Sequence, residues 1–203
     1  MVQLALIVGS LMLCGPSTAR RPPELAFIEQ RLEEYPDSWR LLEQTHRKFH
    51  LMFVSKTDFD VLNNKCLTIS KIESLKESKW EKKVTYYTFP NKTQTKFSCL
   101  KVGIKRSDEH CVFENQLTAT NAKDERKTEW KSQIVYTDYK HCILMWSKVL
   151  GYSVWAETKY LRDNDEIPYL CVLLFELLSG IAKRWVYDWQ YCPGRTTTLL
   201  SEA

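Results

Sequence analysis

Short runs of alternating apolar and polar residues recur along most of this chain, and they constrain its fold more than any other feature. Such alternation places the apolar side chains on one face of a β-strand, because successive side chains point to opposite faces. The runs are separated by polar and turn-forming residues at regular spacing, which is typical of all-β folds. We expect about eight strands, at 49–53, 67–69, 84–86, 100–104, 111–113, 132–136, 142–146 and 152–156.

Eight antiparallel strands can close into a barrel whose interior either is filled by side chains or holds one small ligand. A sandwich built from the same strands is the alternative. The fold alone does not establish ligand binding, because one fold can serve many functions.

Helical patterns flank the strands. Apolar residues recur at helical spacing over 25–35, and Asp37-Ser38 can cap a second short turn. Near the C-terminus, leucines at helical spacing over 170–178 predict an amphipathic helix, with Asp165 as its N-cap and Gly180 as its stop. We expect this second helix to pack on the outside of the barrel.

The N-terminus resembles a secretory signal peptide. An apolar run at 4–13 is followed by small residues up to Ala19, after which we expect cleavage. The run is shorter than the 20 or so apolar residues that span a bilayer, and no later segment is a better membrane anchor. We therefore expect residues 1–19 to be removed and 20–203 to form one secreted domain.

Seven cysteines are present, and removal of Cys14 with the signal peptide leaves six. An even number in an oxidising compartment predicts three disulfides, although six cysteines allow 15 pairings. Their spacing does not match a zinc site. The sequence Asn91-Lys92-Thr93 is an N-glycosylation acceptor, so we expect Asn91 to lie on the surface.

Charge and motif content exclude several functions. The 29 basic and 25 acidic residues are interleaved, which does not favour a nucleic-acid partner. The basic and aromatic cluster at 79–83 is interpreted as a solvated strand edge, and the four histidines as surface residues. Motifs for nucleophilic, zinc or phosphate chemistry are absent, so we expect no enzyme, no metal and no cofactor.

Five segments, in this order and spacing, resemble the tick salivary lipocalins, also called tick histamine-binding proteins. They are DSWR at 37–40, VYTDYKHC at 135–142, GYSVW at 151–155, IPYLC at 167–171 and RWVYDWQYC at 184–192. The resemblance implies an eight-stranded antiparallel lipocalin barrel with a short N-terminal helix and a C-terminal amphipathic helix outside. It also implies a monomer that sequesters a small host inflammatory mediator without catalysis.

The resemblance further implies disulfide pairing. By position, the two disulfides common in the family correspond to Cys66–Cys192 and Cys142–Cys171. The remaining pair would be Cys99–Cys111, across a hairpin.

Two acidic positions of the family are altered here. In members that bind histamine or serotonin, an acid follows the cysteine that matches Cys142, and a glutamate opens the segment that ends in the tryptophan. This chain has Ile143 and Ser153 there, while Trp155 is kept. A protonated amine removed from water needs a carboxylate partner, so the substitutions favour an apolar or amphipathic lipid such as an eicosanoid or fatty acid.

The remaining candidates leave alternatives open. Alternation places Glu157 on the same face as Trp155, so this acid could still serve an amine. Trp39, Tyr86 and Trp155 are the expected aromatic walls of the pocket. A third possibility is a protein-binding module directed at a host complement or clotting factor, in which the barrel is only a scaffold.

Overall fold

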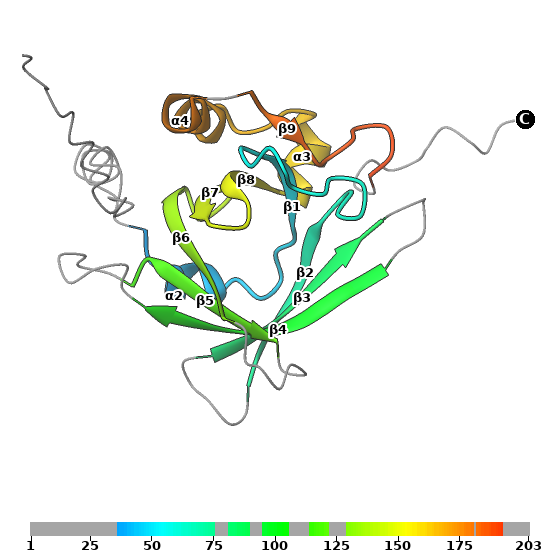
Figure 1. The fold of residues 1–203 in the computed structure, drawn as a ribbon. Helices are drawn as coiled ribbons and strands as arrows, with labels where there is room; N and C mark the ends of the chain where they lie inside the picture. The colour runs from blue at the N-terminus through cyan, green and yellow to red at the C-terminus, as the bar shows by residue number, and fades with distance from the viewer. Residues whose placement is uncertain are drawn as a thin grey trace, which may run out of the picture.

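The central element of the protein is a sheet of antiparallel strands closed into a ring (Figure 1). The computed structural model describes residues 36–75, 81–89, 95–105, 114–121, 129–180 and 182–192. Each strand pairs with the next in sequence, and β1 closes the ring by pairing with both β8 and β2. The eight strands of the ring are β1 (Phe49–Val54), β2 (Thr68–Ser74), β3 (Glu81–Thr88), β4 (Thr95–Lys105), β5 (Gln116–Asn121), β6 (Glu129–Thr137), β7 (Cys142–Ser147) and β8 (Gly151–Glu157). The barrel prediction is confirmed.

Most of the expected strands lie where the alternation placed them. The exception is β5, which has the sequence QLTATN and was not predicted, whereas the expected strand at 111–113 lies outside the described residues. Strand β1 is buried on both faces, with Leu51, Met52 and Phe53 fully inaccessible to solvent. Its inner face contributes to the barrel core and its outer face is covered by the C-terminal part of the chain.

A short helix, α2 (Ser38–Leu42), precedes the barrel. The predicted cap is confirmed, because Oδ1 of Asp37 accepts hydrogen bonds from the backbone N–H groups of Trp39 at 2.8 Å and Arg40 at 3.3 Å. Leu41 and Leu42 are buried and pack in the same apolar cluster as the inner residues of the strands. The helix expected at 25–35 lies outside the described residues.

Two helices lie outside the ring, α3 (Thr158–Asn164) and α4 (Tyr169–Ser179) (Figure 1). Helix α4 is the predicted amphipathic helix, and it ends at Gly180, whose φ of 59° is the left-handed conformation that glycine adopts easily. The prediction that Asp165 is the N-cap of α4 is wrong. Asp165 is the C-cap of α3, with φ of 57°. On the barrel side of α4, the rings of Phe175 and Phe53 are 4.7 Å apart.

Two disulfides fasten the C-terminal region to the barrel. Cys142 at the start of β7 is bonded to Cys171 in α4, and Cys66 just before β2 is bonded to Cys192. Both pairs are those that the family resemblance implied. The tail also adds a two-residue strand, β9 (Arg184–Trp185), to the edge of β1. Cys111 and Asn91 lie outside the described residues, so the third disulfide and the glycosylation site stay predictions.

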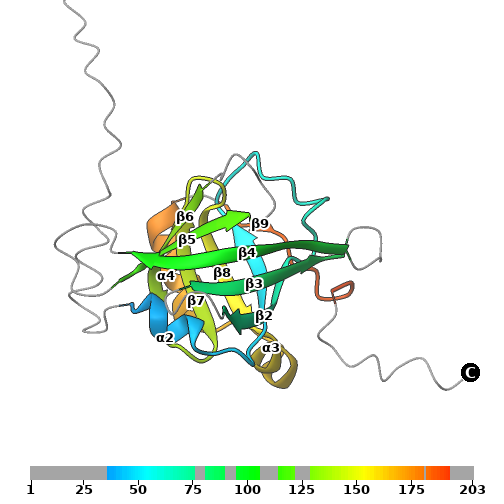
Figure 2. The same cartoon turned by 90° about the horizontal axis from the view of Figure 1, so that it is seen from below.

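Figure 2 shows β3 and β4 in front of β7 and β8, so these two pairs of strands lie on opposite sides of the ring. Within the described ranges, no helix is both long and apolar enough to cross a membrane.

Candidate functional site

The barrel encloses a cavity of about 360 Å³ to which all eight strands of the ring contribute. Helix α2, the loop between β1 and β2, and the turn between β7 and β8 complete its wall. Of the 24 described lining residues, 19 are aliphatic or aromatic, and the polar ones are Asn64, Lys131, Ser132, Ser147 and Ser153. No aspartate or glutamate is among them. A pocket with this lining is suited to an apolar ligand that makes a few polar contacts.

Four of the six ligand-binding candidates from the sequence meet in this cavity: Tyr86, Ile143, Ser153 and Trp155. Ile143 on β7 is the cross-strand partner of Trp155 on β8. Ser153 lies two residues before Trp155 and therefore on the same face of β8. Ile143 and Ser153, the two positions that the sequence analysis singled out, thus flank Trp155 inside the barrel.

Tyr86 on β3 supplies a polar group to an otherwise apolar part of the wall. Its removal from bulk water raises the pKa of the phenol to about 12, so it stays protonated at neutral pH. A neutral phenol can both donate and accept a hydrogen bond. It is therefore a polar contact that does not demand a charged ligand.

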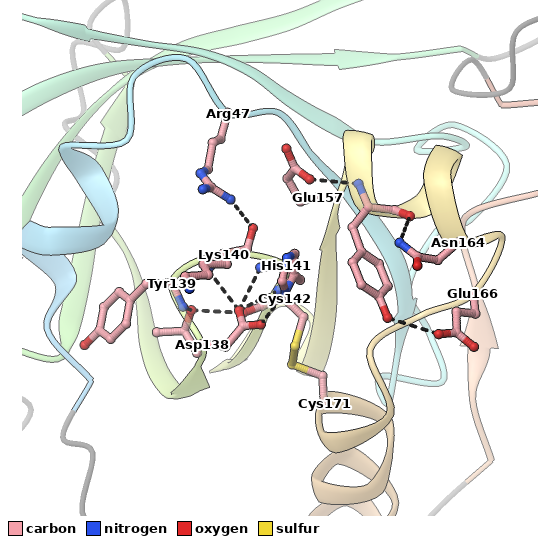
Figure 3. Close-up of polar contacts among 12 residues, drawn as sticks. Arg47, Asp138, Tyr139, Lys140, His141, Cys142, Glu157, Asn164, Glu166 and Cys171 are labelled. Atoms are coloured by element: carbon pink, nitrogen blue, oxygen red, sulfur yellow. Dashed lines mark hydrogen bonds and ion pairs between the residues drawn. A yellow bond between two sulfur atoms is a disulfide. The ribbon is translucent and has the colours of Figure 1, made fainter.

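Glu157 lies outside the cavity lining. It precedes α3, and its Oε2 accepts a hydrogen bond from the backbone N–H of Tyr160 at 2.8 Å, as an N-cap does (Figure 3). It also borders a separate polar surface pocket with His46, Arg47 and His141. The structure therefore places this acid away from Trp155, although the two residues share strand β8.

Trp39 is likewise not part of the cavity lining. Its ring lies over the ammonium of Lys82, with Nζ 4.7 Å from the ring centroid. Lys82 itself is 8% exposed, and its Nζ donates a hydrogen bond to Oγ of Ser74 at 3.0 Å. The interpretation of 79–83 as a solvated strand edge is therefore wrong at Lys82. The alternation of Lys82 with Val84 and Tyr86 was the sequence feature that could have identified it.

His50 is a second buried polar residue that the sequence analysis assigned to the surface. It is 3% exposed, and its ring lies against Tyr187 of the C-terminal tail, with centroids 5.1 Å apart. Its Nδ1 is 2.7 Å from Oγ1 of Thr68, whose own proton is directed to the carbonyl of Cys66. Nδ1 therefore carries the proton of a neutral ring, and burial lowers the pKa of His50 to about 4.

The family-like segment before β7 forms a turn organised by Asp138 (Figure 3). Its Oδ1 accepts hydrogen bonds from the backbone N–H groups of Lys140, His141 and Cys142 at 3.0, 2.8 and 3.0 Å. Partial burial would raise the pKa of Asp138, but these hydrogen bonds outweigh it and hold the pKa below its usual value. The turn fixes the position of Cys142, and through it the bond to Cys171.

Several solved structures are similar to this one, and the first described here supports the fold. The structure resembles a protein named AM182, crystallised as a serotonin complex, with a TM-score of 0.60 and 14% identity over 80% of this chain and 96% of that one. For the siderocalin Ex-FABP the TM-score is 0.44 and the sequence identity is 16%, over 68% of this chain and 81% of that one. For apocrustacyanin C1 the TM-score is 0.47 and the identity is 11%, over 77% of this chain and 87% of that one. The search of curated protein sequences finds no match.

The sequence itself carries a wider match. A model of the tick histamine binding protein family covers residues 27–193, which include every strand, all three described helices and both observed disulfides. The fold and the family that the sequence predicted are thus confirmed, and the chain belongs to the tick histamine binding protein family.

Proposed function

We propose that this protein captures one small apolar or amphipathic lipid, such as a fatty acid or an eicosanoid, inside its barrel and catalyses no reaction. The observation that carries the proposal is the cavity wall, which is apolar and contains no carboxylate among its described residues. A biogenic amine is a cation at neutral pH. Burying it without an acidic partner costs more free energy than its apolar contacts return.

The proposed mechanism is stoichiometric trapping. Removal of the lipid's apolar surface from water supplies most of the affinity, at about 25 cal/mol for each Å² buried. The phenol of Tyr86 and the hydroxyl of Ser153 give hydrogen bonds that discriminate between ligands. Trapping consumes one protein molecule for each ligand, so the amount of protein sets the capacity.

Amine binding is the alternative that a test has to separate from lipid capture. The family takes its description from histamine, and AM182 was crystallised with serotonin. In this chain Ile143 and Ser153 stand at the acidic positions, and both line the cavity. Glu157, which could have replaced them, caps α3 instead.

The proposal includes the setting in which capture takes place. Cleavage after Ala19 would release the domain into an oxidising compartment, and the two observed disulfides support that setting. A glycan on Asn91, the bond Cys99–Cys111 and a monomeric state belong to the same proposal.

Calorimetric titration of the delipidated, oxidised protein tests the function directly. Histamine, serotonin, an 18-carbon monounsaturated fatty acid and a leukotriene are titrated side by side, and lipids extracted from the protein before delipidation are identified by mass spectrometry. We expect one-to-one binding of the lipids and no heat from the amines. Tight amine binding would overturn the proposal. Binding of none of the four would also overturn it and would favour a host protein as the partner.

A further inference from the structure

A row of three paired residues places Lys82 on the inner face of the barrel. Lys82 on β3 is the partner of Ser74 on β2 and of Val102 on β4. Directly opposed residues of neighbouring strands project from the same face of a sheet. Val102 lines the cavity, and so does Val84, two residues further along β3. Lys82 therefore points to the interior and not to solvent.

The cation at this position has no anionic partner among the described residues. Its Nζ contacts the hydroxyl of Ser74 at 3.0 Å and the face of Trp39 at 4.7 Å, and none of the described ion pairs includes it. A hydroxyl dipole and an aromatic ring both attract a cation, but neither neutralises it. Because a buried charge is costly unless it is paired, the site favours a ligand that brings a negative charge.

The ammonium lies next to the end of the cavity covered by α2. Trp39 belongs to this helix, whose residues Leu41 and Leu42 line the cavity. The neighbouring row of paired residues, Ile72, Val84 and Leu100, also lines it. Two residues along a strand correspond to about 7 Å. The four-carbon stem of a lysine is flexible, so the ammonium can turn from Ser74 to a ligand's head group.

We propose that Lys82 is the anion subsite of the cavity, and that the ligand is a carboxylate with a long apolar chain. This inference rests on the proposed function and adds the ligand's orientation. The carboxylate lies under α2, paired with Lys82, and the chain extends towards Val149 and Leu150 in the turn between β7 and β8. The ion pair then gives the buried lysine a negative partner, which none of the described residues provides.

Lys131, the lysine among the described lining residues of the cavity, tests the alternative position for the carboxylate. The side chain of Lys131 on β6 is 58% exposed and lies 3.6 Å from Glu129, so its charge is hydrated and already has an acidic neighbour. If the carboxylate were held at the exposed rim of the cavity, Lys131 would hold it. Lys82→Met and Lys131→Met therefore distinguish a buried head group from one at the rim.

The experiment compares an 18-carbon monounsaturated fatty acid with the alcohol of the same chain, by calorimetry at pH 7.5 on delipidated protein. We expect the wild type and Lys131→Met to bind the acid about tenfold or more tightly than the alcohol, as is typical of a hydrogen bond to a charged group. Lys82→Met should bind both equally, and Lys82→Arg should keep the preference. If Lys82→Met fails to fold, Lys82→Gln replaces it, since an amide can still bond to Ser74.

Each outcome decides between the two proposals. If the wild type binds acid and alcohol equally well, or if the preference survives in Lys82→Met, the subsite is refuted while lipid capture stands. If the preference disappears only in Lys131→Met, the head group lies at the rim and the subsite is again refuted. If the wild type binds neither compound, lipid capture itself fails, and the subsite with it.

Discussion

The indole Nε1 of Trp155 donates a hydrogen bond to Oγ of Ser153 at 3.3 Å, inside the cavity. The two residues are neighbours on one face of β8, and Ser153 Oγ lies 3.4 Å from the carbonyl of Met145 on β7. The polar atom of the tryptophan is therefore satisfied within the protein. What the ring offers to a ligand is its apolar surface.

Trp155→Ala should weaken lipid binding about tenfold or more, because it removes the largest apolar side chain from this part of the wall. Trp155 is only 3% exposed, so we also expect the free energy of unfolding to fall by about 3 kcal/mol. Calorimetry and urea denaturation measure the two effects. Trp146→Ala is the control, since Trp146 on neighbouring β7 is 37% exposed and outside the cavity lining. Equal losses of affinity in both variants would argue against Trp155 as a ligand contact.

Restoring the two acids should convert the cavity to amine binding. Ile143 pairs with Trp155, which places Ser153 diagonally across from it, so Ile143→Asp with Ser153→Glu puts two carboxylates beside the tryptophan. We expect histamine binding to appear in calorimetry and fatty-acid binding to weaken. The combination Ile143→Asn with Ser153→Gln has similar size without charge and should bind no histamine. Histamine binding by this neutral variant would show that charge is not the deciding factor.

Acid should destabilise the protein through His50. Its pKa is about 4 in the folded protein and 6.5 when unperturbed, so between these values the unfolded chain binds a proton that the folded protein does not. Stability therefore falls as the pH falls, by about 3 kcal/mol between pH 7 and pH 4. Protonation would also place a proton on Nε2, which has no hydrogen-bond partner in the described structure.

Urea denaturation at pH 7 and pH 4 isolates this contribution. His50→Gln removes the titrating group. Its free energy of unfolding should therefore fall by about 3 kcal/mol less than that of the wild type between pH 7 and pH 4. His46→Gln is the matched control, because His46 is exposed. If His50→Gln and His46→Gln give the same pH dependence, the buried ring does not control the acid response.

Two glycines with the same backbone conformation should respond differently to alanine. Gly151 has φ of 66° and Gly180 has φ of 59°. A Cβ at Gly180 would meet nothing within 4 Å, whereas at Gly151 it would lie 2.3 Å from Oγ of Ser55, which accepts a hydrogen bond from Tyr152 N–H at 2.8 Å. We expect Gly180→Ala to cost about 1 kcal/mol and Gly151→Ala about 3 kcal/mol, measured by thermal denaturation. Similar losses would show that Ser55 moves aside freely.

Local patterns predicted the parts of the fold that depend on local physics. Alternation located most of the strands because one face of each strand is apolar, and Asp37 and Gly180 acted at the helix ends as their chemistry requires. Strand β5 was missed because QLTATN has only two apolar residues, at Leu117 and Ala119. Helix α3 was missed because it has a single buried residue, Leu161, and therefore no apolar periodicity.

The candidate site was predictable where a strand face could be assigned. Ile143, Ser153 and Trp155 line one cavity, and their role in ligand binding stays a prediction. Glu157 follows the same alternation, but the start of α3 redirects its carboxylate to a helix cap. The burial of His50 depends on Tyr187, which is distant in sequence, so no local pattern could show it. For Lys82 the alternation with Val84 and Tyr86 could have shown the inward position, but not the contact with Trp39.

The bond between Cys66 and Cys192 joins residues 126 positions apart in the chain. During synthesis this bond cannot form until residue 192 has been made, by which time the residues of all eight strands of the ring have been synthesised. Cys142 and Cys171, which are 29 positions apart, become available to each other earlier. The order of the chain therefore makes Cys66–Cys192 the later of the two observed native bonds to become possible, after the last strand of the ring has been synthesised.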